Sequence, residues 1–513
     1  MSSDGSRDYL GDGLLANEAA AASREQPLPS VIADDAPALL AAPSAGERGA
    51  GVSDAVLFLL TVNVVIGSGI VGLPYAFNSA GLVVSLVSMV GWTAVYVVTL
   101  SWLLAALGRV GGELDWIGLV REFLGRKGEL GATATVLLFT YGLLWSYAAM
   151  FSATASLLTT AALGWERECD IYNEPSDACV RANQLAALAF GAAMLPLSMV
   201  DIEGSGSLQA VFTAYRFVAV AAILTTVGVA ALVGADAGGA AVPVAAAARR
   251  ALSASAVAAA ARRGARLGGG VDGAHWYDGL GIAFSTISTS QICHLQAPSL
   301  VRAAREPDRA LRTLALALAT TGALNAAVGV TGAFFGERTE QLATLNWKAY
   351  DGHGFDAPAG APCAAWAVGV RMLVLAFPLL ASASSFPISA VVLATNLNEV
   401  APARVRARLS PAGLKVAGRL IAVLPPVLLT MAEHQLSVVF DVTGLCSFVL
   451  GLALPAMLLL RSHSCGRPLI GRSRHRLLQL LGGRPAAYAL LALAAVSVAL
   501  SVLSAAGVVS RRR

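Results

Sequence analysis

The sequence TVNVVIGSGIVGLPYAF, residues 61–77, combines features that seldom occur together in one apolar segment. It contains no charged residue, and three glycines and a proline fall within residues 67–74. Both residue types weaken a helix, and an unsatisfied backbone group inside a bilayer is costly unless it lines a cavity. Close helix packing through small residues would explain the glycines, but it would require neither Pro74 nor the amide of Asn63. The segment therefore predicts a membrane-spanning helix that is broken at a binding site.

The composition of the whole chain also indicates a membrane protein. Of its 513 residues, 56% are hydrophobic and 13% are charged, whereas a typical soluble domain carries roughly 25% charge. A spanning helix needs about 20 apolar residues. Stretches without Asp, Glu, Lys or Arg that can supply such helices lie at 55–108, 130–165, 279–301, 372–398 and 485–510. The net charge of +4 is dispersed, so we expect no nucleic acid partner, and an ordinary soluble enzyme is excluded.

Division of the apolar runs at Gly, Pro and charged residues predicts eleven transmembrane helices. The loops on the same side of the membrane as the N-terminus carry most of the Lys and Arg. The positive-inside rule therefore places the N-terminus in the cytoplasm. The predicted helices lie at 54–77, 82–108, 131–163, 184–200, 217–235, 276–296, 313–335, 366–397, 416–432, 437–460 and 485–509.

Three regions follow from this division. Residues 1–51, rich in Ala, Ser, Gly, Pro and Asp, are predicted to form a disordered cytoplasmic tail. Residues 52–510 form the eleven-helix domain. Within it, 235–274 is predicted to be a low-complexity, non-cytoplasmic loop, although its arginines fit the positive-inside rule poorly.

The cysteines give a partial check on this topology. Cys169, Cys179 and Cys363 all fall in predicted non-cytoplasmic loops. An oxidising compartment permits a disulfide between two of them, and the sequence does not choose the pair. Free loop thiols are the alternative.

A second interrupted segment is GLGIAFSTISTSQICHLQAP, residues 279–298, which is the sixth predicted helix. Interrupted helices in corresponding positions of two halves are typical of binding sites in secondary transporters, where half-helix N-termini bind a carboxylate and unwound carbonyls bind a cation. Each hydroxyl of this segment could instead bond to the preceding turn of its own helix. The candidate substrate-binding residues are Ser285, Thr286, Ser288 and Thr289.

The first of these segments, VNVVIGSGIVGLPYAFNSAG at 62–81, resembles the first-helix signature of the amino acid/auxin permease family. That family includes sodium-coupled neutral amino acid transporters and vacuolar amino acid transporters. The resemblance extends less sharply over about 53–509, and it implies an all-α integral membrane protein. Ten of its eleven helices would form a five-plus-five inverted repeat of the leucine-transporter type, with helices 1 and 6 broken.

The resemblance also implies roles for individual residues. Residues 285–291 match the unwound part of the sixth helix, and Asn63 lies beside the coupling ion. The eighth helix departs from the family pattern because it contains both Pro378 and Pro387, which leaves the register of its sodium-coordinating hydroxyl open. The residues placed around the substrate carboxylate are Gly67, Ser68, Gly69 and Ile70, and the candidate sodium ligands of the eighth helix are Ser382, Ser384 and Ser385.

The distribution of charge suggests the substrate and the ion. Arg216 falls in a predicted cytoplasmic loop. Asp441 falls at the non-cytoplasmic end of the tenth predicted helix, where a solvated side chain is expected and a role in gating or proton relay is the alternative. No charge is therefore expected at mid-membrane depth, and neutral L-amino acids are the expected substrates. Sodium needs only oxygen ligands, whereas a proton relay needs a titratable group, and His294 is the candidate. An interfacial histidine without a transport role is the alternative. We therefore predict sodium coupling, with the proton as the other candidate ion.

These inferences combine into one functional hypothesis. The chain is expected to be a monomeric secondary active transporter that moves neutral amino acids by alternating access, with no cofactor except Na⁺ or H⁺. It would reside in the plasma membrane or in an endomembrane, lysosomal or vacuolar. The alternatives are a proton-coupled vacuolar or lysosomal amino acid exporter and an amino acid sensor of the same fold with little flux. A membrane enzyme is disfavoured because the predicted helices contain no paired carboxylates or His/Asp cluster.

Overall fold

The structure is a computed structural model of the 513-residue chain. It describes residues 52–111, 114–163, 169–173, 175–199, 206–236, 276–352, 354–355, 363–464 and 482–510. The predicted tail at 1–51 lies outside these residues, as does nearly all of the predicted loop at 235–274. Within the described ranges the chain is helical and contains one isolated β-bridge, between Val52 and Ala304.

The helices lie where the sequence predicts apolar spans. The first half contains α2 (Asp54–Val65), the 3₁₀-helix η2 (Ser68–Gly72), α3 (Leu73–Ala80), α4 (Leu82–Arg109), α5 (Trp116–Leu163), α6 (Asp177–Met199) and α7 (Gly206–Asp236). The second half contains α10 (Trp276–Gln291), α11 (Ala297–Ala303), α12 (Pro307–Phe335), η3 (Gly336–Arg338), η4 (Ala343–Ala349), α13 (Ala365–Val400), α14 (Ala403–Arg408), α15 (Pro411–Ala432), α16 (Leu436–Phe448), the π-helical turn η5 (Val449–Ala453), α17 (Leu454–Ser464) and α19 (Arg484–Ser510).

The lengths of these helices establish a multi-pass membrane protein. Nine spans among the described residues are long and apolar enough to cross a membrane, and the bent pair formed by α2 and α3 brings the number up to ten. α10 has 16 residues, fewer than the roughly 20 that one span requires. The eleven-helix count therefore stays a prediction.

α5 begins earlier than the sequence predicts. Its backbone bends at Gly125, whose φ of 66° lies in the left-handed region, where glycine has no steric penalty. The part after the bend covers the predicted span at 131–163. The part before it, from Trp116, was assigned to a loop because Arg121, Arg126 and their neighbours are charged.

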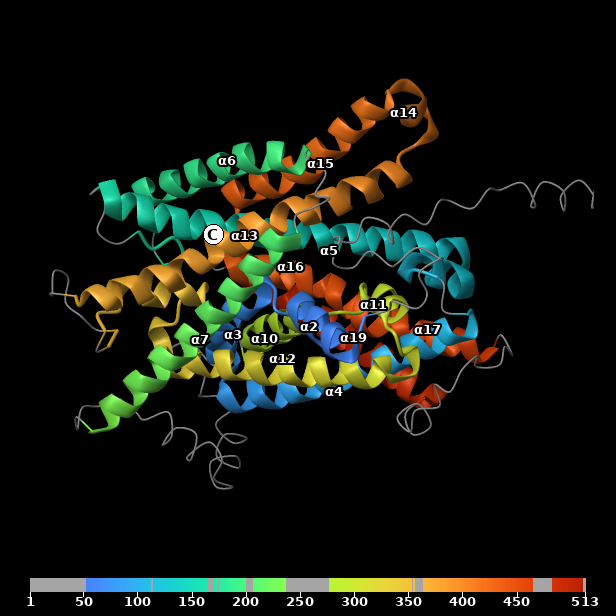
Figure 1. Ribbon diagram of the computed structural model, residues 1–513, viewed down its shortest axis with the longest axis horizontal. Helices are drawn as coiled ribbons and strands as arrows, with labels where there is room; N and C mark the ends of the chain where they lie inside the picture. The colour runs from blue at the N-terminus through green and yellow to red at the C-terminus, as the bar shows by residue number, and fades with distance from the viewer. Residues whose placement is uncertain are drawn as a thin grey trace, which may run out of the picture.

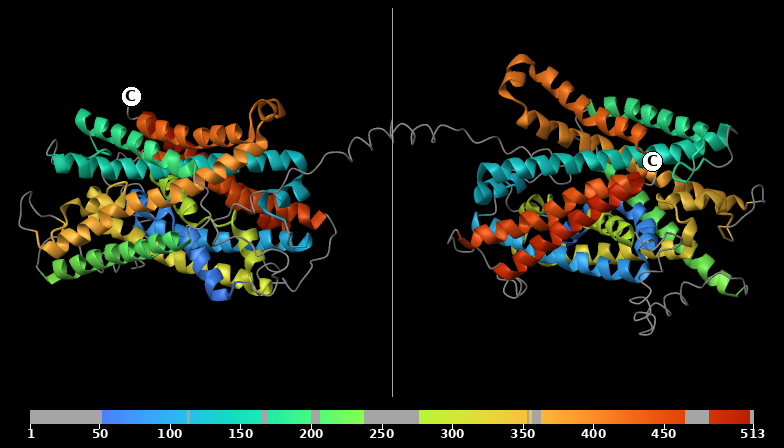
Figure 2. Two further views of the ribbon diagram at one scale, coloured as in Figure 1. Left: turned by 45° about the horizontal axis from the view of Figure 1, so that its top comes forward. Right: turned by 180° about the vertical axis from the view of Figure 1, so that it is seen from behind.

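The two interrupted segments occupy the centre of the molecule. Figure 1 shows α2, α3 and α10 between α5 and α13 on one side and α4 and α12 on the other, and the views in Figure 2 agree. α10 packs against α3, α16 and α19, while α12 packs against α2 and α3. The side chains of Tyr96 and Phe448 are fully buried nearby. Val87 and Val90, on the outer face of α4, are 68% and 71% exposed, as expected of residues that face lipid.

Backbone hydrogen bonds join the start of α2 to the connection between α11 and α12. The amide of Val52 donates to the carbonyl of Ala303 over 2.9 Å, and the amide of Arg305 donates to the carbonyl of Val52 over 3.0 Å. The beginning of the described chain and this connection therefore share one face of the molecule, as the predicted topology requires of two loops on the same side of a membrane.

Candidate functional site

The first interruption is caused by the local sequence. α2 ends at Val65, Ile66 has a non-helical ψ of 77°, and Gly67 is extended, with φ −107° and ψ −152°. The chain then resumes as η2 and α3, and the halves 54–65 and 69–80 meet at an angle of 51°. Pro74 occupies the first turn of α3, where its missing N–H costs no hydrogen bond.

The second interruption lies later in the sequence than predicted. Residues 285–291 match the family's unwound segment, yet they belong to the last turns of α10, and the helix ends only at Gln291. The non-helical residues are 292–296, after which α11 begins with Pro298 in its first turn. A neighbouring helix supports the new end, because the Nδ2 of Asn325 donates to the carbonyl of Ser290 over 3.2 Å. The carbonyls at the end of a helix lack partners within it, so α12 stabilises the break.

The two interruptions are in direct contact. A Cβ atom added to Gly69 would lie 2.8 Å from both Cα and Cβ of Ser290, closer than side chains can pack. Gly69 thus allows η2 to approach the backbone of α10. Gly67 differs, since a Cβ atom there would meet nothing within 4 Å. Ile70 is buried in the core, and the side chain of Ser68 lies outside what the structure describes.

The four hydroxyl residues predicted to bind substrate divide between two faces of α10. Ser285 donates to Oδ1 of Asp441 over 2.6 Å. Ser288 lies 2.5 Å from the hydroxyl of Tyr96 and 2.6 Å from that of Ser447. These two serines therefore face α4 and α16.

The other two hydroxyl residues are closer to the broken first helix. Thr286 is buried and precedes Ser290 by four residues, so it lies on the face that contacts Gly69. The Oγ1 of Thr289 is also buried, and no described residue bonds to it. The buried hydroxyl of Thr289 could therefore bond to a ligand.

Asp441 was expected at a solvated helix end, and this expectation is wrong. Its side chain is fully buried between α10 and α19. It accepts the bond from Ser285 on Oδ1, and on Oδ2 it accepts a second bond, of 3.0 Å, from Ser504. Sequence reasoning missed this site because the position lies within one turn and a half of the start of α16, where a charge is usually solvated.

Three of the four residues predicted to bind the coupling ion contact α7. Asn63 accepts a hydrogen bond on Oδ1 from Thr213 over 3.1 Å. Ser384 and Ser385 accept bonds from the guanidinium of Arg216 over 3.0 and 2.5 Å. The Oγ of Ser382 is buried, and it has no hydrogen-bond partner within the described ranges.

Arg216 was assigned to a loop, and this assignment is wrong as well. α7 begins at Gly206, ten residues earlier, so the arginine lies within a helix and projects toward the middle of α13. The signal available in the sequence was weak: residues 211–215 continue the apolar pattern toward the N-terminus, but the charge of Arg216 was taken as the boundary.

His294 lies within the second interruption and is fully buried. Its Nε2 is 2.8 Å from the hydroxyl of Thr99, and its ring packs edge-on against Tyr96 at 5.0 Å between centroids. No described residue bonds to Nδ1. The side chain therefore packs inside the protein, and both hypotheses for His294, a proton relay or a histidine without a transport role, stay predictions.

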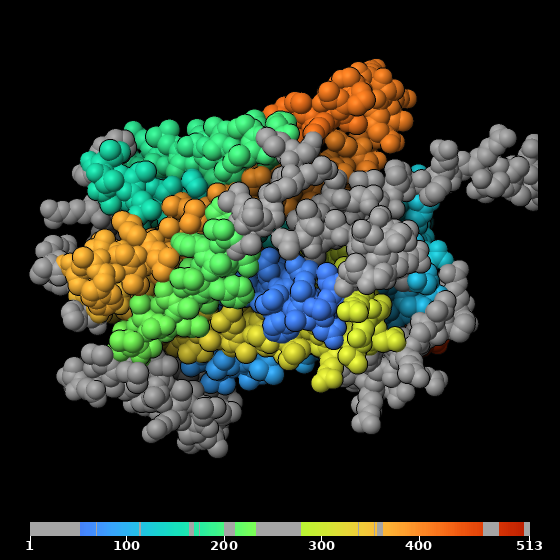
Figure 3. All heavy atoms as spheres, in the orientation of Figure 1, coloured from blue at the N-terminus to red at the C-terminus, as the bar shows by residue number. Residues whose placement is uncertain are grey.

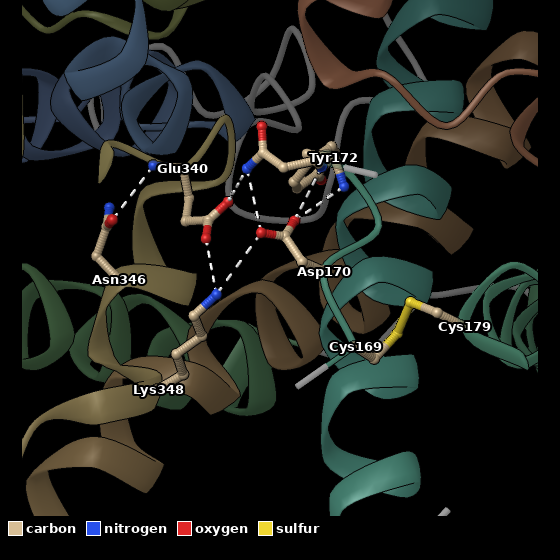
Figure 4. Close-up of polar contacts among 8 residues, drawn as sticks. Cys169, Asp170, Tyr172, Cys179, Glu340, Asn346 and Lys348 are labelled. Atoms are coloured by element: carbon tan, nitrogen blue, oxygen red, sulfur yellow. Dashed lines mark hydrogen bonds and ion pairs between the residues drawn. A yellow bond between two sulfur atoms is a disulfide. The ribbon is translucent and has the colours of Figure 1, made fainter. Parts of the chain in front are cut away.

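A polar cluster connects the residues between α5 and α6 with those that follow α12 (Figure 4). Cys169 and Cys179 form a disulfide, which selects one pair among the three predicted cysteines, and Cys363 is free. Lys348 bridges Glu340 at 2.9 Å and Asp170 at 3.7 Å. Burial raises the pKa of the Glu340 carboxyl, and the ammonium of Lys348 acts in the opposite direction. The loop between α5 and α6 is thereby joined to the region that follows α12.

The described residues contain no group of three His, Cys, Asp or Glu side chains that could hold a metal ion. The groups around the two interruptions are non-helical backbone, hydroxyls and one imidazole.

Comparison with known proteins identifies the family. Residues 48–464 match the family model described as "Transmembrane amino acid transporter protein". The chain belongs to this family, and the resemblance of the first helix is confirmed. Because the family is one of transporters, membrane transport of amino acids is the function of this class.

More specific relatives are distant. Over 166 residues the chain is 26% identical to the "Transmembrane protein 104 homolog" of Drosophila melanogaster, and the match covers 32% of each protein, so it spans about a third of that relative's length. Two mutant crystal structures of the Eremococcus coleocola manganese transporter are similar to this chain. Each is 13% identical and covers 88% of it and 86% of the transporter, with TM-scores of 0.48 and 0.49. At this level of likeness the overlay carries no functional information.

Proposed function

We propose that the chain is a secondary active transporter that moves neutral amino acids across a membrane by alternating access. The observation that carries this proposal is the contact between two interrupted helices, where Gly69 brings η2 against Ser290 of α10. Interrupted helices offer backbone N–H groups and carbonyls to a ligand at the depth of the membrane. The extended backbone at Gly67 and the free hydroxyl of Thr289 are the candidate contacts for the carboxylate of an amino acid.

A substrate without a charged side chain fits this region best. The two buried charges nearest to it are engaged elsewhere: Asp441 bonds to Ser285 on another face of α10, and Arg216 bonds to α13. Neither charge lies at the contact between Gly69 and Ser290. We therefore keep neutral L-amino acids as the proposed substrates.

The proposed topology has eleven helices, ten of them in a five-plus-five inverted repeat, with the N-terminus in the cytoplasm and the chain acting as a monomer. We also propose that the chain resides in the plasma membrane or an endomembrane. Cysteine-accessibility labelling at Ser44 and Ser410 tests the topology, because both should react from the same side. Reaction from opposite sides would contradict the eight spans predicted between these two positions, and with them the eleven-helix topology.

Sodium coupling is the less favoured of the two coupling hypotheses. A sodium ion coordinated by Ser384 and Ser385 would lie beside the positive guanidinium of Arg216, which donates hydrogen bonds to both serines. Repulsion between these two charges favours the alternative in which a proton gradient, or exchange of one amino acid for another, drives transport.

Counterflow in proteoliposomes tests the proposed function. Purified full-length protein is reconstituted into vesicles loaded with unlabelled alanine, leucine and glutamine, and accumulation of the same tritiated amino acids is followed. We expect accumulation above protein-free vesicles for at least one of the three. Saturable binding without accumulation would favour an amino acid sensor instead.

A further inference from the structure

The face of α7 that carries Thr213 and Arg216 contacts three of the four residues predicted to bind the coupling ion. These two residues are three positions apart, so they lie on one side of the helix. Thr213 reaches Asn63 on α2, and Arg216 reaches α13. Figure 3 shows α7 beside the exposed part of α2 on one face of the molecule. α7 therefore bridges the first half of the broken helix and the helix predicted to hold sodium ligands.

The guanidinium of Arg216 donates to both Ser384 and Ser385. The two serines follow each other in the middle of α13. Their oxygens, which would coordinate a sodium ion, accept hydrogen bonds from the guanidinium instead. An arginine is always protonated in proteins. A positive charge is thus present at this position whatever the composition of the solution.

The charge has no acidic partner in the described part of the chain. No carboxylate there lies within ion-pair distance of Arg216, and its Nε is buried without a hydrogen bond. A sodium ion at the same oxygens would place two like charges side by side, with only hydroxyl and amide dipoles to offset them. Electrostatic repulsion therefore excludes simultaneous occupation.

An arginine near a helix end often extends its head to the membrane surface. Arg216 does not, because its acceptors lie about halfway along α13 and its side chain is only partly exposed. Intramembrane ionisable residues with such partners mark functional positions.

Given the proposed transport function, on which this step rests, we infer that Arg216 is a built-in cation that takes the place of a sodium ion at Ser384 and Ser385 of α13. It ties Ser384 and Ser385 to α7 permanently. Transport by this chain is therefore independent of sodium, and Arg216 is the residue that sets this ion specificity.

The first test uses the wild-type protein. Counterflow of tritiated alanine, leucine and glutamine is compared in vesicles containing sodium chloride and in vesicles containing N-methylglucamine chloride. We expect rates that agree within about twofold. A fivefold or larger stimulation by sodium would overturn the inference.

The second test measures ion binding without transport. Scintillation-proximity binding of ²²Na⁺ to the purified protein should show no saturable component. A saturable component that disappears in the Ser384→Ala/Ser385→Ala double variant would overturn the inference. If no amino acid is accumulated under any condition, the proposed function fails, and this binding measurement still decides the role of Arg216.

Variants of Arg216 supply the third test. Arg216→Gln should lower sodium-independent counterflow at least tenfold, and Arg216→Lys should recover part of it because the charge is restored. The matched control is Arg371→Gln. Arg371 lies on α13, as Ser384 does, but thirteen residues before it in the sequence. Undiminished sodium-independent transport by Arg216→Gln would contradict the inference. If that variant does not fold, as judged by size-exclusion chromatography, the two wild-type measurements decide.

Discussion

The two interruptions at the centre of the molecule end their helices by different means. In the first, the chain itself prevents a continuous helix, because Gly67 is extended and Pro74 restarts the helix after it. In the second, α10 ends at Gln291 with no glycine or proline until Pro298. Its end is supported from outside, by Asn325 at the carbonyl of Ser290.

The difference shows which part of a binding region is encoded locally. A break made by glycine and proline depends on a few adjacent residues. A break made by neighbouring helices depends on residues far away in the sequence, and it should respond to changes in those neighbours. The first interruption is therefore expected to tolerate changes around it better than the second, except where the two touch.

The contact between them should be the most sensitive position. Gly69→Ala would place a methyl group 2.8 Å from the backbone of Ser290, and the overlap can be relieved only by moving η2 away from α10. We expect a loss of about 1–3 kcal/mol of stability and a clearly lower melting temperature in detergent. An unchanged melting temperature would mean that the two interruptions do not touch as described.

Asp441 anchors the helix of the second interruption to α16 and α19. In Asp441→Ala the hydroxyls of Ser285 and Ser504 lose their buried acceptor, which costs about 1–3 kcal/mol. Asp441→Asn keeps one acceptor oxygen and should lose less. Thermal unfolding of the two variants side by side checks the order. Equal stability of Asp441→Ala and wild type would show that α10 does not depend on this anchor.

Substitution of His294, the middle residue of the non-helical segment 292–296, probes the packing of the second interruption. His294→Gln can keep a bond to Thr99 but loses the edge-on contact with Tyr96, which is worth about 1 kcal/mol. We expect a small drop in melting temperature and transport whose ion dependence is nearly that of wild type. Loss of pH-driven uptake in this variant, with the protein still folded, would instead assign the proton relay to His294.

Gly67→Ala should have the smallest effect on stability, so it separates substrate binding at the first interruption from folding. Its φ is negative and the added Cβ atom meets nothing within 4 Å, so the change should stay within about 0.5 kcal/mol of wild type. If the substrate binds the extended backbone there, the variant should raise the KM for uptake severalfold at an unchanged melting temperature. An unchanged KM would move the binding site away from Gly67.

Much of the architecture could be predicted from the sequence because it follows from local properties. The apolar runs predict the helices, and the glycines with Pro74 predict the first break to within a few residues. The sequence predicts the second break too early, because residues 285–291 resemble the unwound segment of the family's sixth helix whereas α10 continues to Gln291. In the structure Ser285 and Ser288 satisfy their hydroxyls with residues of other helices, so α10 continues through them.

The buried charges could not be predicted in the same way. Arg216 and Asp441 both lie close to helix ends in the sequence, where charged residues normally meet water. Their burial depends on which helices pack over them, α13 for the arginine and α10 with α19 for the aspartate. The sequence contains no local signal for these contacts.

The polar cluster at the end of α5 has a consequence for the order in which the protein is made. The loop closed by Cys169 and Cys179 bonds to residues of the 340s, and Gln435 then joins both parts by donating to the carbonyl of Tyr172 over 3.1 Å and accepting from Gln341. The amide of Ser437 completes the set with a bond to Gln341. A ribosome must therefore synthesise the chain as far as Ser437 before this set of contacts can form. Until then the polar groups of the growing chain have to find temporary partners, in water or in the insertion machinery.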